Sequence, residues 1–265
     1  MPRKVARYGW IPDLPDHRDY LFAAPAAVLA KLPAKIDLTK KCPEVYDQGE
    51  IGSCTANAIG GAIEFDQMKQ KLRDAFMPSR LFVYYNERAM ENTINDDSGA
   101  MIRDGIKSVA KQGVCPETMW PYDPTPFPPN PHLTKKPSPH CYKEALKHTA
   151  LEYQRVPRNL SQMKGCLALG YPFVLGFTVY DSFESDEVAR TGNMPMPSPR
   201  EHVLGGHAVL AVGYDDKQSR FRVRNSWGED WAIKGYFTMP YAYLLDDNLS
   251  DDFWKITLVS GSALS

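Results

Sequence analysis

The sequence has no long apolar run and no excess of charge of one sign. Its most apolar stretch near the start, residues 21–32, contains Pro25 and Lys31 and is too short to span a bilayer. The polar residues ahead of that stretch are untypical of a secretion signal. Lysine and arginine number 31 against 32 acidic residues, so bulk attraction to nucleic acid is not expected. These absences predict a soluble chain with no membrane span, no nucleic-acid partner and no visible targeting segment.

Cysteine is scarce and lacks the spacing of a metal site or a disulfide framework. The five cysteines are an odd number and contain no C-x-x-C pair, and the paired aspartates lack EF-hand spacing. We therefore expect no metal and no cofactor. A bridge between Cys115 and Cys141 stays open. A chain of 265 residues with 43% hydrophobic residues is long enough to bury a core without such supports.

The order of the expected elements predicts an α+β fold of two lobes. Residues 1–31, rich in proline, aspartate and alanine, form a separate leader. Apolar spacing predicts helices over 53–72, 77–92 and 101–112, and the proline-rich segment 121–139 is expected to be irregular. Short β-prone runs follow at 173–180, 207–214, 220–225 and 235–239. Helices first and strands later indicate a helical lobe over about 32–145 and a β lobe over about 146–265.

Cys54 is the candidate nucleophile, because it opens a helix for which Ser53 is the expected N-cap. The positive end of the helix dipole and the unpaired N–H groups of the first turn favour a thiolate. Gln48, six residues upstream in a glycine-punctuated loop, could direct its amide N–H₂ at an oxyanion together with the Cys54 N–H. Taken alone, a cysteine at a helix start is more often structural than catalytic.

His207 is the best placed of the six histidines to act as the base. It begins a strand after two glycines, and a polar turn centred on residue 216 leads into the next strand. An antiparallel hairpin about that turn would pair His207 with Asn225 and Ala211 with Phe221. Asn225 could then accept a hydrogen bond from the imidazole, as in a Cys-His-Asn arrangement, and Trp227 could shield that bond from water.

Three blocks of this sequence together resemble the signature blocks of the papain-like cysteine peptidases. They are Gln48-Gly-Glu-Ile-Gly-Ser-Cys54, Gly206-His207-Ala-Val-Leu-Ala-Val-Gly-Tyr214 and Asn225-Ser-Trp-Gly228 with Gly235-Tyr236. Their order and separations suit that family, and the similarity runs from about Leu32 to the C-terminus. The short chain with its leader looks most like compact bacterial members. The resemblance implies a helical left lobe, a barrel-like antiparallel right lobe and an active-site cleft between them.

The resemblance also implies which residues bind the substrate, and the sequence departs from the family pattern in three places. Thr55 stands where the family has an aromatic residue, and Ile51 and Asp97 stand where it has a disulfide. Ala100 replaces a glycine. The implied specificity pocket (S2) is apolar and open, with a floor that the sequence does not identify. The substrate-binding positions are Gly99, Ala100, Met101, Ile102, Gly176, Ala208 and Trp227.

The sequence therefore predicts a monomeric cysteine endopeptidase that hydrolyses peptides or proteins with an apolar P2 residue. The alternative is a catalytically silent relative that acts by binding, against which the intact set of Gln48, Cys54, His207 and Asn225 argues. The proline-rich leader is expected to lie extended along the cleft and restrain activity, with Leu14, Tyr20 or Leu21 reaching the S2 pocket. The other reading is a leader packed on the molecule as a structural strap.

Overall fold

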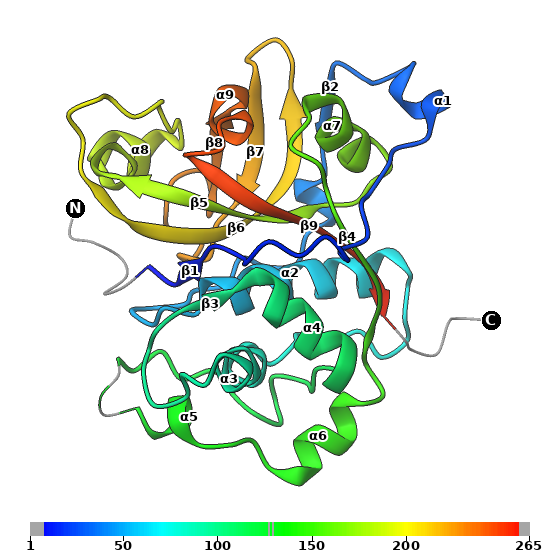
Figure 1. Cartoon of the computed structure of the whole chain (residues 1–265), viewed down its shortest axis with the longest axis vertical. Coiled ribbons are helices and arrows are strands. Elements are labelled where there is room, and N and C mark those ends of the chain that lie inside the picture. The colour runs from blue at the N-terminus through cyan, green and yellow to red at the C-terminus, as the bar shows by residue number, and fades with distance from the viewer. Residues whose placement is uncertain (1–7, 127, 129, 260–265) are drawn as a thin grey trace.

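The computed structural model describes residues 8–126, 128 and 130–259, and divides them into a helical layer and a sheet layer. Figure 1 shows the sheet above and the helices of residues 54–145 below, with the leader running between them and the remaining short helices beside the sheet. The first seven residues of the leader lie outside the described residues. The predicted α+β class and the order of helices before strands are confirmed.

The helical layer contains α2 (Cys54–Lys69), α3 (Arg80–Glu91) and α4 (Ile102–Gln112), each within three residues of the predicted bounds. The predicted irregularity of 121–139 is wrong in part, because α5 (Pro131–Thr134) and α6 (Pro139–Ala145) begin there. Each has proline in its first turn, where the missing N–H of proline costs no hydrogen bond. The side chains of Asn130 and Ser138 cap α5 and α6, respectively. No helix in the described part of the chain is long and apolar enough to cross a membrane.

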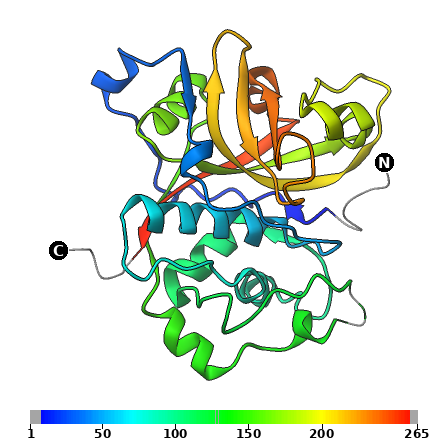
Figure 2. The same cartoon turned by 180° about the vertical axis from the view of Figure 1, so that it is seen from behind.

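Helix α2 lies at the centre of the molecule, against the sheet on one side and the other helices on the other (Figure 2). It is buried over nearly its whole circumference, as its apolar residues predict. Gly61 allows this close packing, because a Cβ there would lie 2.6 Å from Nη1 of Arg224. The helix thus fixes the position of its first residue, Cys54, at the boundary between the two layers.

The sheet contains seven strands in the order β4-β9-β5-β6-β7-β8, with β2 paired beside the end of β6. Its pairs are antiparallel, and in the described part of the chain it stays open instead of closing into a barrel. The sequence predicted β5, β6, β7 and β8 and missed β2, β4 and β9. The strands are β2 (Lys35–Asp37), β4 (Ala150–Arg155), β5 (Phe173–Tyr180), β6 (Val203–Asp215), β7 (Arg220–Arg224), β8 (Tyr236–Pro240) and β9 (Ser250–Val259).

The remaining elements are short. A two-stranded parallel pair joins β1 (Trp10–Ile11) in the leader to β3 (Ala100–Met101). The other short helices are α1 (Ala26–Leu29), α7 (Leu160–Ala168), α8 (Asp186–Thr191) and α9 (Tyr241–Leu245), with 3-10 turns at Thr39–Lys41 and Asp181–Glu184.

The predicted register of the β6–β7 hairpin is wrong by two residues. Ala211 pairs with Val223, not with Phe221, and the pairing shifts once more at a bulge before Gly213. Asp215 pairs with Arg220, so the turn comprises residues 216–219 and lies further along the chain than the predicted centre at residue 216. The bulge adds the extra residue on β6. His207 consequently does not face Asn225 across the hairpin.

The leader has two structurally different parts. Residues 8–11, which we call the tip, lie over the start of α2 and pair with β3. Residues 13–31, which we call the strap, follow the sheet: Phe22 N–H donates to Arg155 O at 2.8 Å, and Arg155 N–H donates to Tyr20 O at 2.8 Å. Phe22 and Ala24 are buried in the core. The strap is therefore packed like any other part of the fold.

Candidate active site

Cys54 is fully buried at the first position of α2. Ser53 precedes the helix as predicted but does not cap it with its side chain. Its hydroxyl lies 2.6 Å from the Tyr122 hydroxyl and accepts from Asn57 Nδ2 at 3.0 Å. The N–H groups of Ala208, Gly9 and Thr55 lie against the Cys54 sulfur. Ala208 directly follows His207, so the chain brings the two predicted residues to one place.

His207 and Asn225 are joined by a hydrogen bond of 2.8 Å between Nε2 and Oδ1, although the hairpin does not pair them. Asn225 follows the end of β7 and is diagonal to His207, a separation that side chains of this length can bridge. The Ser226 N–H also donates to Asn225 Oδ1, at 2.8 Å, which fixes the orientation of the amide. His207 Nδ1 is buried without a hydrogen-bond partner.

Trp227 covers the histidine as predicted. Its ring lies over the imidazole with centroids 5.2 Å apart and planes 32° apart, and it is buried. Phe177 packs edge-on against the imidazole from β5 at 5.7 Å. The Nε2–Oδ1 hydrogen bond is therefore enclosed by aromatic rings and shielded from water.

Gln48 is fully buried beside the start of α2. Its Oε1 accepts from the Ser226 hydroxyl at 2.6 Å and its Nε2 donates to Ile51 O at 2.8 Å. Because an amide nitrogen carries two hydrogens, one N–H is left for another acceptor. Ser226, which directly follows Asn225, therefore links the segment of Asn225 to the loop of Gln48.

A buried carboxylate joins the two loops that carry Ile51 and Asp97. The Gly52 N–H donates to Asp97 Oδ2 at 3.0 Å, and the Tyr84 hydroxyl donates to Oδ1 at 2.5 Å. The resemblance implied that the family has a disulfide at this place. Here a hydrogen-bonded carboxylate links the same segments, and all five cysteines are free.

The tip of the leader covers the predicted substrate-binding residues. Gly9 O accepts from Ala100 N at 2.8 Å, and a Cβ on Gly99 would lie 2.2 Å from Gly9 O. Met101 pairs with Ile11, while Ile102 and Ala208 are fully buried.

Tyr8 and Trp10 flank Gly9 in the sequence, and their rings lie against the neighbouring residues Gly205 and Gly206 of β6. The Tyr8 ring contacts His207 and Trp227, with centroid distances of 5.7 and 6.3 Å, and its hydroxyl donates to Glu184. Trp10 lies against Gly176.

The expectation that Leu14, Tyr20 or Leu21 fills the pocket is wrong. These three side chains are 65–77% exposed, whereas the Trp10 indole lies against Gly176, one of the predicted lining residues. The missed signal is the aromatic pair that flanks a glycine at Tyr8-Gly9-Trp10. Trp10 is the tryptophan of the leader, and its side chain is buried, unlike the three exposed side chains named above.

Burial of the site favours the uncharged forms of both central residues. It raises the pKa of Cys54 to about 12, against the lowering effect of the Ala208, Gly9 and Thr55 N–H groups. It lowers the pKa of His207 to about 4, against the hydrogen bond with Asn225. The tip contributes to this burial, because Tyr8 and Gly9 lie directly on the two residues. In the covered site a neutral thiol and a neutral imidazole are favoured.

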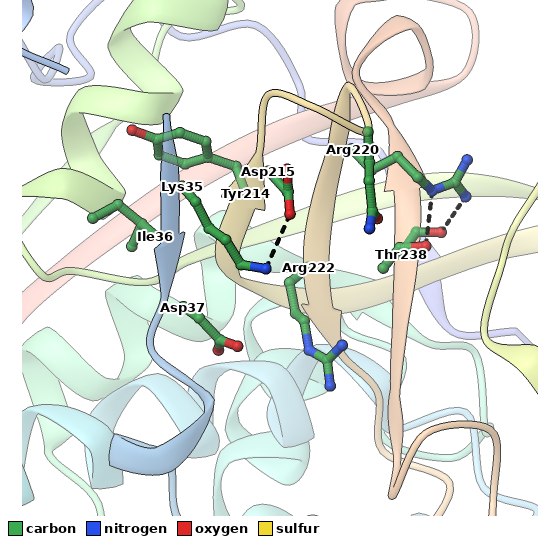
Figure 3. Close-up of a pocket in the computed structure, with 9 residues that line it drawn as sticks. Lys35, Ile36, Asp37, Tyr214, Asp215, Arg220, Arg222 and Thr238 are labelled. Atoms are coloured by element: carbon green, nitrogen blue, oxygen red, sulfur yellow. Dashed lines mark hydrogen bonds and ion pairs between the residues drawn. The ribbon is translucent and has the colours of Figure 1, made fainter. Parts of the chain in front are cut away.

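A separate hollow of about 80 Å³ lies at the far end of the sheet (Figure 3). Its wall includes β2, the end of β6, β7 and β8, and Lys35 makes an ion pair with Asp215 at 3.0 Å. Tyr214 lies seven residues along β6 from His207, which corresponds to roughly 23 Å of strand. None of the predicted site residues lines this hollow.

Comparisons with known proteins relate the whole chain to one family. The profile of the papain family of cysteine proteases matches residues 32–244. An uncharacterized peptidase C1-like protein of Acanthamoeba polyphaga mimivirus is 43% identical over 277 residues, covering 96% of this chain and 87% of that protein. The crystal structure of xylellain, a cysteine protease from Xylella fastidiosa, is similar with a TM-score of 0.91 and 49% identity, covering 97% of this chain and 98% of that one.

A more distant structure, a procathepsin B of Trypanosoma congolense, has the same fold with a TM-score of 0.74 and 19% identity, covering 97% of this chain and 87% of that one. The family profile spans most of this chain, and the resemblance seen in the three sequence blocks is confirmed. The chain belongs to the papain family of cysteine proteases and is a cysteine peptidase that acts on peptide substrates.

Proposed function

We propose that this chain is an endopeptidase in which Cys54 is the nucleophile, His207 the general base and acid, and Asn225 the residue that orients His207. One observation carries the proposal: His207 uses Nε2 for Asn225 and leaves Nδ1 buried without a partner, while the next N–H along β6 lies against the Cys54 sulfur. Buried polar atoms without a hydrogen-bond partner are rare in native proteins, and a catalytic role is one explanation for them.

The hydrogen bond of Asn225 selects the tautomer of His207. Its Oδ1 already accepts from the Ser226 N–H, so Oδ1 is the acceptor toward the ring and Nε2 carries the hydrogen. The lone pair of the neutral imidazole is then on Nδ1, the nitrogen left for the thiol proton. Nδ1 takes that proton when the Cys54 sulfur attacks the peptide carbonyl, and returns it to the leaving amine.

The oxyanion would be held by the backbone N–H of Cys54 and the free N–H of Gln48. Two contacts position the Gln48 amide: the Ser226 hydroxyl on its oxygen and Ile51 O on its nitrogen. Donors that are fixed in advance stabilise developing charge without reorganisation. The covered cleft contains apolar walls, which supports a substrate residue with a large apolar body at P2.

We further propose that the tip of the leader restrains the enzyme. The Gly9 N–H is close enough to the Cys54 sulfur to lower the pKa of the thiol, so the tip occupies the place from which a substrate carbonyl would approach the sulfur. Gly9 is the point of closest approach, because a Cβ on it would lie 1.7 Å from Gly52 O. Any larger residue at this position would keep the tip from seating.

Hydrolysis of a fluorogenic peptide by the full chain and by the Gly9→Ala chain tests the catalytic assignment. We expect Cys54→Ala and His207→Ala to abolish turnover in both, and in the Gly9→Ala chain we expect iodoacetamide to label Cys54 ahead of the other four cysteines. His202→Ala is the matched control, since His202 is exposed and pairs with Asp181 at 3.1 Å. Turnover that survives Cys54→Ala, or equal labelling of all five cysteines, would contradict the assignment.

A further inference from the structure

Tyr122 joins the two segments that carry the proposed oxyanion donors. It lies in the irregular segment between α4 and α5. Its hydroxyl donates to Gln48 O at 2.9 Å and lies 2.6 Å from the Ser53 hydroxyl. Gln48 carries one proposed donor, and Ser53 directly precedes Cys54, whose N–H is the other. We call these two contacts of the Tyr122 hydroxyl the Tyr122 link.

The donors and acceptors of the Tyr122 link have one consistent arrangement. A phenol has a single hydrogen, which Tyr122 donates to Gln48 O. The hydrogen in the 2.6 Å contact then comes from Ser53, whose hydroxyl oxygen accepts from Asn57 Nδ2 at 3.0 Å. Ser53 and Gln48 are both fully buried. Loss of the Tyr122 hydroxyl would therefore remove one hydrogen bond from a buried group on each segment.

The side chains around Tyr122 fix its ring and its backbone. The guanidinium carbon of Arg80 lies 4.1 Å from the centre of the ring, a cation–π contact. Arg80 Nη2 pairs with Glu117 Oε1 at 2.6 Å, and the same oxygen accepts from the Tyr122 N–H at 3.1 Å. None of these three contacts uses the Tyr122 hydroxyl. A phenylalanine at position 122 would keep them, so the hydroxyl can be removed without removing the ring.

Gln48 is held by the sheet layer on its other side. Its N–H donates to Ser226 O at 2.9 Å, in addition to the contact of its side chain with the Ser226 hydroxyl. These contacts fix Gln48 relative to Asn225, whereas the Tyr122 link fixes it relative to Ser53 and the start of α2. An oxyanion site depends on donors that are held at the right separation before the reaction begins.

We propose that Tyr122 is a positioning residue of this peptidase, whose hydroxyl sets the separation between the Gln48 amide and the Cys54 N–H. The proposal rests on the proposed function and adds a residue to it. Tyr122 acts through Gln48 and Ser53 and stabilises the oxyanion that forms when the peptide carbonyl is attacked. The competing explanation is a hydroxyl that only stabilises the fold. The two explanations differ in which reactions of Cys54 the hydroxyl should affect.

Two reactions of Cys54 test the proposal in Tyr122→Phe, made in the full chain and in the Gly9→Ala chain. Hydrolysis of a fluorogenic peptide forms an oxyanion, whereas alkylation by iodoacetamide displaces iodide from carbon and forms none. We expect kcat/KM for the peptide to fall by about tenfold, less than the roughly hundredfold effect of removing a donor outright. The alkylation rate should stay within about twofold. Tyr142→Phe is the matched control, since that hydroxyl donates to Asn86 Oδ1 at 2.8 Å inside the helical layer, and should change neither rate.

Ser53→Ala is the second variant, because it cuts the Tyr122 link at its other end. We expect it to slow hydrolysis more than alkylation as well, and it tests the proposal even if Tyr122→Phe fails to fold. Unchanged hydrolysis in both variants would overturn the proposal. Equal slowing of hydrolysis and alkylation would also overturn it, since a general disturbance of the fold would affect both reactions of the thiol.

A Gln48→Ala chain supplies the third measurement. A residue that acts through Gln48 has less to position when that amide is absent, so Tyr122→Phe should slow hydrolysis by a smaller factor there than in the unaltered background. The same factor in both backgrounds would overturn the proposal. None of these outcomes affects the proposed function, which would instead be contradicted by turnover that survives Cys54→Ala.

Discussion

Asn225 is the residue at which chemistry and stability separate most clearly. Asn225→Ala removes the acceptor of His207 Nε2 but only a small buried side chain, so the imidazole can rotate or change tautomer. We expect kcat/KM to fall by about tenfold to a hundredfold, since correctly placed proton transfer contributes at least that much. The melting temperature should change by no more than a few degrees. Asn248→Ala, at an exposed turn, is the control, and equal losses in both variants would contradict the orienting role.

Asp97 is a single residue whose side chain stabilises the fold next to the site. Asp97→Ala would leave the buried Gly52 N–H and Tyr84 hydroxyl without their acceptor. We expect the free energy of unfolding to fall by about 2–4 kcal/mol, and turnover to fall with it because Gly52 is two residues from Cys54. Urea unfolding measures the first effect. Asp96→Ala, its exposed neighbour, should change stability by less than about 0.5 kcal/mol.

The burial of His207 beside Cys54 should make the stability of the covered state depend on pH. Burial lowers the pKa of His207 from 6.5 to about 4, so the covered state binds fewer protons than an open state with a hydrated imidazole. Its advantage is present above about pH 6.5 and is lost as the pH falls toward 4. We expect iodoacetamide labelling of Cys54 in the full chain to approach the rate in the Gly9→Ala chain on acidification. A ratio of the two rates that stays constant from pH 7.5 to 4.5 would contradict this.

At the scale of elements, the tip and the start of α2 form a contact that one methyl group should disrupt. Gly9→Ala places a Cβ 1.7 Å from Gly52 O, so the tip cannot return to the cleft while the strap stays in place. We expect labelling of Cys54 and peptide turnover to rise by about tenfold or more, since a clash with backbone exceeds 1.4 kcal/mol. Leu14→Ala is the control, because that side chain is 68% exposed. If both chains have the rate of the unaltered protein, the tip does not restrain the enzyme.

In the β6–β7 hairpin the sequence predicted which residues form the two strands, but it predicted the wrong register between them. The alternation of apolar residues identified both strands, but a register depends on turn length and bulges. The sequence does not mark the bulge before Gly213. His207 and Asn225 still meet, because a shift by two residues keeps both side chains on the same face.

At the scale of the whole molecule, the strap should be needed for folding and the tip should not. A chain of residues 32–265 would lose the buried Phe22 and would leave Arg103 without Asp19. Those two losses correspond to roughly 2 and 3–5 kcal/mol, a large part of the stability of an ordinary domain. We therefore expect this chain to unfold at much lower urea or to fail to fold. A chain that lacks only residues 1–11 should fold and gain activity, with a fall in its urea midpoint smaller than that of the 32–265 chain because it loses the buried Trp10 but keeps the strap. Equal stability of the two truncated chains would show that the strap is dispensable.

The fold class, the central helix and the four residues proposed for catalysis could be predicted from the sequence. These features depend on local patterns: the spacing of apolar residues in α2, the alternation in β5 and the short blocks around Cys54, His207 and Asn225. Such patterns can be recognised in a single sequence because they involve only residues that are close together along the chain. The family resemblance rests on the same blocks, and the comparisons confirm it.

The residues that cover the cleft could be identified in the folded structure alone. Trp10 and Asp252 are 242 residues apart in the sequence and 3.0 Å apart in space, and no local pattern records such a contact. The same holds for Asp97, which meets Gly52 from a loop 45 residues away, and for Asp13 and Asp19, whose arginine partners belong to α4 and β4. Contacts between distant segments depend on how whole elements pack, and packing is a property of the folded chain.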